Sequence, residues 1–132
     1  MGSASPSRKM VQQYVTVKKG GPFQIVRTPY PTPGADEVCI RNRAIGLNPL
    51  DCKSLAHGMM VESWPAVLGI ACAGVVEAVG ESVTIVKPGD AVLCLAGFDT
   101  KAGAFQDITT VPESYVARKP KDWNFNEAAS VP

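Results

Sequence analysis

The chain has 132 residues, of which 45% are hydrophobic and 19% are charged, and its formal net charge is +1. A chain of this length buries roughly two-thirds of the surface that its unfolded form exposes, so it needs no disulfide or metal to hold a core. The balanced charge offers no broad electrostatic footprint. This disfavours nucleic acid and anionic membranes as partners and favours a small or neutral one.

Residues 1–9 are predicted to form a disordered cytosolic tail. They lack the apolar stretch of a secretory signal, and Pro6 stands where a myristoylation signal needs serine or threonine. The longest apolar run, 66–76, is shorter than the ~20 residues of a membrane span and is predicted to be a buried strand region. We therefore expect a cytoplasmic protein with no membrane partner.

Short strands separated by glycine and proline are predicted along most of the chain. Segments that mix β-branched and aromatic residues near period two are 11–18, 23–28, 37–45, 74–78, 91–95, 105–111 and 115–118. The first two flank Gly20-Gly21-Pro22 and are expected to form a hairpin. The 11 prolines and 12 glycines, mostly between these segments, are typical of a mainly β fold, a small barrel or sandwich.

Two short helices are predicted. Asn48 is a favourable N-cap residue and Pro49 suits the first helical position, so one helical turn is expected after Asn48. Asp51 is interpreted as a helix-start carboxylate rather than a catalytic acid or base, because nothing nearby is expected to raise its pKa. A second helix is predicted at 124–129.

The metal-binding residue types are scattered. The four cysteines stand without a Cys-x-x-Cys pair or a paired histidine, and they are Cys39, Cys52, Cys72 and Cys94. Buried free thiols are favoured over zinc ligands for all four. His57, the only histidine, stands in a predicted loop, where an exposed residue is more usual than a catalytic one.

Three motifs in order resemble the medium-chain dehydrogenase/reductase family across its GroES-like catalytic domain. They are Ala-Gly-Val-Val-Glu-Ala-Val-Gly at 73–80, Pro-Gly-Asp-Ala-Val at 88–92 and Gly-Ala-Phe at 103–105. Each alone supplies only permissive backbone between strands. The resemblance implies a GroES-like β-barrel with one or two short helices over 10–120. Residues 121–132 would then begin a connector to a nucleotide-binding domain.

The resemblance also bears on metal and nucleotide binding. In zinc-dependent members, metal ligands stand at the positions of Asn48, Ile70 and Ala71, and neither isoleucine nor alanine has a lone pair to offer. No second cysteine lies between Cys94 and Phe105, where a structural-zinc lobe would need one. No Gly-x-Gly-x-x-Gly motif occurs, so we expect no Rossmann domain in this chain. The pattern is similar to the zinc-free branch, which includes quinone oxidoreductases and the enoyl reductases that act in trans with fungal polyketide synthases.

Similarity to this branch implies specific site residues. The nicotinamide of NADPH would lie beside the Asn-Pro turn, which makes Asn48, Pro49 and Lys53 the candidate cofactor contacts. Without zinc, hydrogen-bond donors or a cation must stabilise charge on the substrate's carbonyl oxygen, and Lys53 is the catalytic candidate. A solvated surface lysine is the alternative for Lys53, and a helix cap is the alternative for Asn48. Met59, Met60 and Trp64 are candidates for an acyl-binding cleft, with core packing as the alternative.

The resemblance implies the N-terminal portion of a zinc-independent, NADPH-dependent oxidoreductase that reduces an enoyl thioester or a quinone. Its substrate would be a small molecule or an acyl group on a carrier, with a fungal polyketide synthase as candidate partner. On this expectation, the chain alone binds NADPH weakly and is inactive. The alternatives are a truncated, non-catalytic β-barrel that serves as a protein-interaction module and, less favoured, a GroES-like co-chaperonin.

Overall fold

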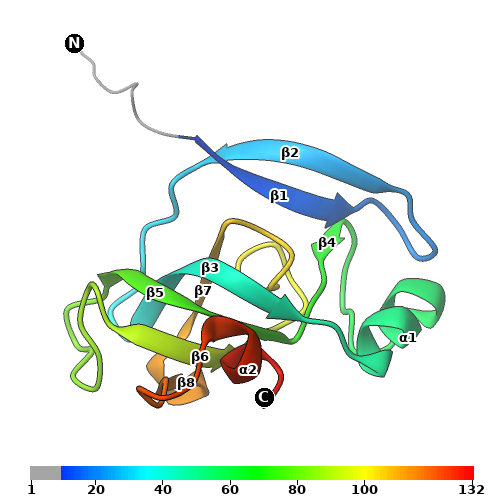
Figure 1. Cartoon of the computed structure of the whole chain (residues 1–132). Helices are drawn as coiled ribbons and strands as arrows, with labels where there is room; N and C mark the ends of the chain where they lie inside the picture. Colours follow the sequence, from blue (N-terminus) through cyan, green and yellow to red (C-terminus); the bar gives the residue numbers. More distant parts are fainter. Residues whose placement is uncertain (1–9) are drawn as a thin grey trace, which may run out of the picture.

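The structure is a computed structural model that describes residues 10–132. The predicted tail at 1–9 lies outside the described residues. Two antiparallel sheets dominate the fold (Figure 1). The smaller sheet has the order β2-β1-β4 and consists of β1 (Met10–Thr16), β2 (Phe23–Pro29) and β4 (Ala66–Val67). The prediction of a mainly β fold is confirmed.

The larger sheet has the order β7-β3-β5-β6-β8. Its strands are β3 (Glu37–Gly46), β5 (Ala71–Val79), β6 (Ala91–Leu95), β7 (Ile108–Pro112) and β8 (Val116–Arg118). A short 3-10 helix, η2 (Glu113–Tyr115), joins β7 to β8. The sheet curls around its buried face, as its ribbons show in Figure 1.

The predicted hairpin is present, with β1 and β2 paired from Met10↔Pro29 to Thr16↔Phe23. The first strand ends at Thr16, before the predicted limit of Lys18, because the turn follows directly. The predicted strand at 105–111 begins only at Ile108. The residues before Ile108 bond to β1 instead: the Asp107 N–H donates to the Gln12 carbonyl at 2.9 Å.

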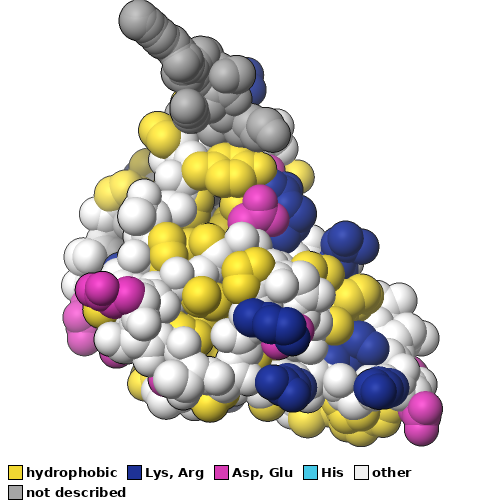
Figure 2. Space-filling view, turned by 90° about the vertical axis from the view of Figure 1, so that its left-hand side faces the viewer, with side chains coloured by type: hydrophobic (Ala, Val, Ile, Leu, Met, Phe, Trp, Pro, Cys, Tyr) yellow, Lys and Arg dark blue, Asp and Glu magenta, His cyan; other side chains and the backbone are white. Residues whose placement is uncertain are grey.

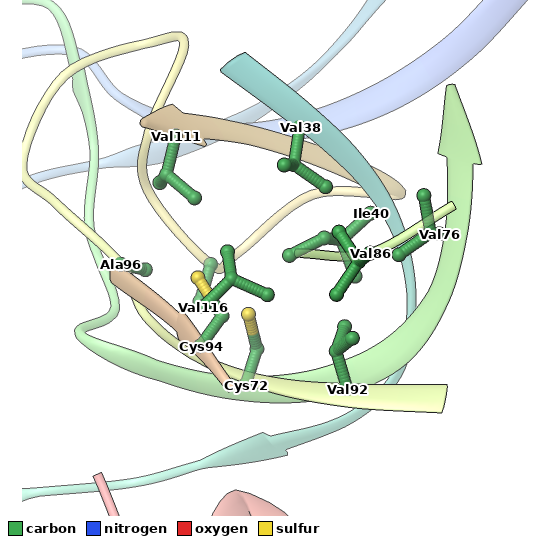
Figure 3. Packing of buried hydrophobic residues seen from close by; sticks show 11 residues of the cluster. Val38, Ile40, Cys72, Val76, Val86, Val92, Cys94, Ala96, Val111 and Val116 are labelled. Carbon is green, nitrogen blue, oxygen red and sulfur yellow. The ribbon is translucent and has the colours of Figure 1, made fainter. Parts of the chain in front are cut away.

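The core lies inside the curl of the larger sheet (Figure 3). Most of its fully buried members come from β3, β5, β6 and β7, and they include Val38, Ile40, Cys72, Val92, Cys94 and Val111. Cys72 and Cys94 are direct partners on β5 and β6. Three cysteines are buried free thiols as predicted, but Cys52 is exposed. The prediction was wrong there because the helix containing Cys52 turns this residue toward solvent.

That helix, α1 (Pro49–His57), is longer than the single turn predicted. It ends at Gly58, whose φ of 73° is left-handed and whose N–H donates to the Ser54 carbonyl at 2.9 Å. His57 is therefore the last helical residue rather than a loop residue, and it is exposed as expected.

The second helix, α2 (Phe125–Ala129), packs against β3, β5 and β6. Ala128 and Ala129 are buried against Ala73 of β5. A Cβ atom at Gly46 would overlap the Ala129 carbonyl oxygen, so α2 contacts the end of β3 backbone to backbone.

Within residues 10–132, no helix has the length and apolar character that crossing a membrane requires. Figure 2 shows one face of the molecule, on which several Lys and Arg side chains gather at the lower right and hydrophobic side chains gather at the centre and upper left.

Candidate functional site

The turn at Asn48 joins the end of β3 to α1. Asn48 has extended backbone (φ −128°, ψ 153°) at the N-cap position, and its N–H donates to Asp51 Oδ2 at 2.9 Å. The Asp51 N–H donates to the Asn48 backbone carbonyl at 2.9 Å, and the Asn48 side chain accepts no capping hydrogen bond from it. The Asn48 amide instead donates a long bond of 3.4 Å to the Gly46 carbonyl. Asn48 takes the predicted position, but its side chain is held weakly.

Asp51 starts the helix as predicted, yet it is also buried, with 6% of its surface exposed. Its Oδ1 atom has no hydrogen-bond partner within residues 10–132. Burial raises the pKa of Asp51, and the backbone N–H groups of Asn48 and Ile70 act in the opposite direction. The expectation that nothing raises this pKa was wrong, because the cause is tertiary burial and not a sequence neighbour.

Lys53 is exposed on α1. None of the ion pairs formed among residues 10–132 involves it. Its ammonium is thus free to meet a ligand, and it equally fits the solvated alternative. A catalytic role for Lys53 stays a prediction.

The predicted cleft residues follow α1 in a loop. The exposed fractions of Met59 and Met60 are 45% and 62%, which excludes the core-packing alternative for both. Met60 lines a cavity of about 400 Å³ together with Phe98 and Asp99. Met59 and Trp64 do not line this cavity, and an acyl-binding cleft formed by the three residues stays a prediction.

Sequence reasoning missed two adjoining cavities between the β1–β2 hairpin and the end of β3. One, of about 670 Å³, is apolar and lined by Tyr14, Phe23, Ile25, Ile45, Leu47 and Phe105. The other, of about 210 Å³, shares Tyr14 and Ile45 and adds the polar residues Gln12, Asn42, Arg43, Gln106 and Asp107. Leu47 directly precedes Asn48, so the apolar cavity reaches the predicted turn. The alternation of apolar residues in 23–25 and 45–47 was the available signal.

The residues at the family's zinc positions do not fit a metal. Ile70 is half-buried, Ala71 is fully buried in β5, and neither supplies a ligand atom. Within residues 10–132, no group of three or more His, Cys, Asp or Glu side chains is placed to hold a metal ion. No step through zinc follows from this site.

A Rossmann-type dinucleotide site needs a parallel βαβ unit with a glycine-rich turn. In the described part of the chain, every pairing between strands is antiparallel. Residues 10–132 therefore contain no pyrophosphate site of this type, and a nicotinamide contact at the Asn48 turn stays a prediction.

Comparison with known proteins identifies the fold. The family model described as the alcohol dehydrogenase GroES-like domain matches residues 34–121. The chain belongs to this family. The resemblance to the medium-chain dehydrogenase/reductases and the GroES-like fold class are thereby confirmed. The predicted boundaries at 10 and 120 stay a prediction.

Similar proteins carry several names. The chain is 37% identical over 128 residues to a trans-enoyl reductase of Aspergillus flavipes, covering 92% of this chain and 37% of that protein. It is 35% identical over 116 residues to a zinc-type alcohol dehydrogenase-like protein of Staphylococcus aureus, covering 88% and 34%. A quinone oxidoreductase structure from Pseudomonas syringae has a TM-score of 0.82 and 32% identity, covering 91% of this chain and 37% of that one.

The chain spans about a third of the length of the curated relatives that it matches. Those relatives are described as dehydrogenases and reductases, and the one from Staphylococcus aureus bears a zinc-type name. Zinc independence, choice of nucleotide and substrate therefore stay predictions for this chain.

Proposed function

We propose that this chain is the substrate-facing domain of an oxidoreductase that uses NADPH, without zinc, to reduce the activated C=C bond of an enoyl thioester or a quinone. The observation that carries the proposal is the pair Ile70 and Ala71, which leaves the family's metal position without ligand atoms. Similarity to a trans-enoyl reductase and to a quinone oxidoreductase supports the reaction type. The proposal includes a cytoplasmic location and an acyl-carrier-bound substrate of a fungal polyketide synthase.

When bound, NADPH supplies the hydride. The chain's own residues orient the nicotinamide and stabilise negative charge on the substrate. The weakly held Asn48 amide can hydrogen-bond to the nicotinamide, because only the 3.4 Å bond to Gly46 restrains it. The Lys53 ammonium has three N–H donors and no ion pair with residues 10–132, so it can stabilise negative charge that develops on the substrate's carbonyl oxygen.

The experiment joins the nucleotide-binding domain of the Pseudomonas syringae quinone oxidoreductase after Pro132. We expect NADPH oxidation with an α,β-unsaturated thioester or a quinone, and no loss of rate after treatment with a chelator. The unfused chain is the baseline and should show no turnover above buffer, because residues 10–132 lack a pyrophosphate site. Turnover that requires added zinc would contradict the proposal.

In the same fusion, Lys53→Met tests the proposed role of Lys53 in stabilising charge on the substrate. It should lower kcat and kcat/KM together, by roughly 10-fold or more, because the lost interaction is made mainly in the transition state. Lys121→Met, which changes another exposed lysine, is the matched control and should leave both constants unchanged. Unchanged turnover in Lys53→Met would assign Lys53 to the solvated surface.

A further inference from the structure

Strand β2 forms an open edge of the smaller sheet. The order β2-β1-β4 leaves one side of β2 without a neighbouring strand among residues 10–132 (Figure 1). The register between β1 and β2 runs from end to end without a bulge, and no residue of β2 is buried. Native proteins usually cover, shorten or distort such an edge, because its unpaired backbone groups are a template for another strand. The edge of β2 is therefore a candidate interaction surface.

One contact of β1 shows which backbone groups of β2 point toward the open edge. The Tyr14 N–H donates to the Phe105 carbonyl at 2.9 Å and so points away from β2. Tyr14 stands opposite Ile25, which makes this a non-hydrogen-bonded pair of the ladder. The N–H and C=O groups of Ile25 therefore point outward. Because the direction alternates along a strand, those of Phe23 and Arg27 point outward as well.

These three residues are complementary to a second copy of themselves. With a two-fold axis at Ile25, each Ile25 stands opposite the partner's Ile25, and Phe23 stands opposite the partner's Arg27. All three pairs would be hydrogen-bonded pairs of an antiparallel ladder. Phe23 is 51% exposed and Ile25 is 61% exposed, so each can cover its counterpart. Arg27 is exposed and belongs to none of the ion pairs among residues 10–132, so its guanidinium can lie over the partner's Phe23 ring.

The structure also limits this pairing to two copies. Pro29, the next residue of the outward-pointing series, has no N–H to donate and ends the open edge. The opposite edge of the sheet, β4, is covered by the chain itself. There the Phe105 N–H donates to the Leu68 carbonyl at 3.0 Å, and a Cβ atom at Gly103 would overlap the Val67 carbonyl oxygen. A third copy has no edge to join, so the contact closes at a dimer and does not extend into a fibre.

We propose that two copies of this chain associate through their β2 strands, antiparallel and centred on Ile25, so that their two smaller sheets join into one. The contact involves one short strand from each copy, which is less than the interface of a permanent dimer. The association is therefore weak, with a Kd on the order of 10–100 µM. It depends on no cofactor or substrate and is independent of the proposed enzymatic activity.

Sedimentation velocity of the 132-residue chain, from about 5 to about 500 µM, brackets this Kd. We expect the mass to rise with concentration from 14.0 kDa toward twice that value. Ile25→Lys places two ammonium groups opposite each other at the axis and should raise Kd by at least about 10-fold. Gln24→Lys is the matched control. It adds the same charge one residue away, on the other face of the strand, where it does not oppose itself, and Kd should stay within about 2-fold of the parent value.

Cross-linking tests the register. In a Cys52→Ser background, which removes the exposed thiol, Ile25→Cys brings two thiols together at the axis, at the Cα separation of about 5.5 Å that a disulfide spans. Oxidised glutathione accepts the two electrons and two protons as the disulfide forms, and it leaves as two reduced molecules. Gln24→Cys stands opposite the partner's Val26 and is the control. We expect a covalent dimer on a non-reducing gel, formed at least about 5-fold faster from Ile25→Cys than from Gln24→Cys.

Three results would overturn the proposal. A parent chain that stays at 14.0 kDa up to the highest concentration would leave the β2 edge to a different partner. An Ile25→Lys chain that associates as the parent does would place the contact on another face. Equal cross-linking of Ile25→Cys and Gln24→Cys would indicate random collision. Thermal melting verifies that each variant is folded, and if Ile25→Lys is not, the comparison of the two cysteine variants still tests the register.

Discussion

The two sheets use their apolar residues differently. In β5 of the larger sheet, the four residues from Ala71 to Gly74 are all buried. In β2 of the smaller sheet no residue is buried, although Phe23, Ile25 and Val26 give it the composition of a core strand. The apolar side chains of β5 are therefore buried and stabilise the fold. Those of β2 lie at the surface of the molecule.

The two helices also differ, in how completely their N-termini are hydrogen-bonded. α2 packs on the larger sheet, and its N-cap is closed by reciprocal bonds of 2.8 Å between Asn124 and Glu127. α1 lies beside the hairpin, where the Gly20 N–H donates to the Leu55 carbonyl, and its Asn48 cap is only half made. The less completely bonded side of the molecule is thus the side that carries the candidate site.

The strongest test of this division compares two isoleucines. Ile40→Ala should lower the free energy of unfolding by about 4 kcal/mol, because Ile40 is completely buried in the larger sheet and truncation leaves a cavity. Ile25→Ala, at an exposed site of β2, should change it by less than about 0.5 kcal/mol. Urea unfolding at neutral pH measures both. Equal losses would mean that β2 carries stability as well.

Glycine substitution tests how closely the larger sheet is packed. A Cβ atom at Gly74 would overlap the carbonyl oxygen of Arg41 on β3, so Gly74→Ala forces the strands apart and should cost about 3 kcal/mol. Gly89→Ala is the control, because nothing lies near its Cβ and only its left-handed φ of 95° opposes the change. It should cost about 1 kcal/mol. A smaller loss for Gly74→Ala than for Gly89→Ala would contradict the close contact.

The two helix caps give a smaller difference. Asn124→Ala removes the acceptor of the Glu127 N–H and should cost about 1 kcal/mol. Asn48→Ala removes no complete cap bond and should stay within about 0.5 kcal/mol of the parent. Thermal unfolding of both variants measures the two losses of stability. If Asn48→Ala proves the more damaging, the turn at Asn48 is scaffold, and a loss of activity there could not be assigned to the nicotinamide.

Acid titration gives the smallest effect, with opposite signs on the two sides. The Lys101 ammonium, 2.7 Å from Glu37 Oε2, and the Gly34 N–H lower the pKa of Glu37, so this carboxylate stabilises the fold at neutral pH and stops doing so as pH falls below about 4.5. Burial raises the pKa of Asp51, so its charge destabilises the fold at neutral pH, and the penalty disappears on protonation.

Glu37→Gln should therefore cost about 0.5 kcal/mol at neutral pH, a modest value because Lys101 is half exposed, and nothing at strongly acidic pH. Asp51→Asn should be at least as stable as the parent at neutral pH, and its advantage should vanish in acid. Unfolding by urea across pH measures both. The same sign for the two differences at neutral pH would refute the assignment.

Local pattern and spacing were enough to predict the strands of the larger sheet and the hairpin. The glycines of the family motifs were expected to supply permissive backbone between strands. This explains one of them, and close backbone contacts explain two others. Gly89 does adopt the left-handed conformation of a permissive turn, whereas Gly80 and Gly103 are required because a Cβ would overlap the Gly34 and Val67 carbonyl oxygens. Close approach of backbones distant in sequence cannot be read from the local pattern.

The candidate site was less predictable. The positions of Asn48 and Pro49 follow from capping rules, but the burial of Asp51 depends on the chain near Ile70, which only the fold places there. The two cavities beside the β1–β2 hairpin were missed because an apolar strand on the surface has the same alternation as one in a core. Met59, Met60 and Trp64 were chosen by residue type alone, and their role in an acyl-binding cleft stays a prediction.

The backbone contact between Gly46 and Ala129 has a consequence for natural variation. Any side chain at position 46 would strike the Ala129 carbonyl, and Gly46 stands two residues before Asn48. In a library of all substitutions selected for folding, glycine should be the residue recovered at 46. A variant that tolerates alanine there should carry a second change that moves α2, so the two positions should drift through evolution as a pair.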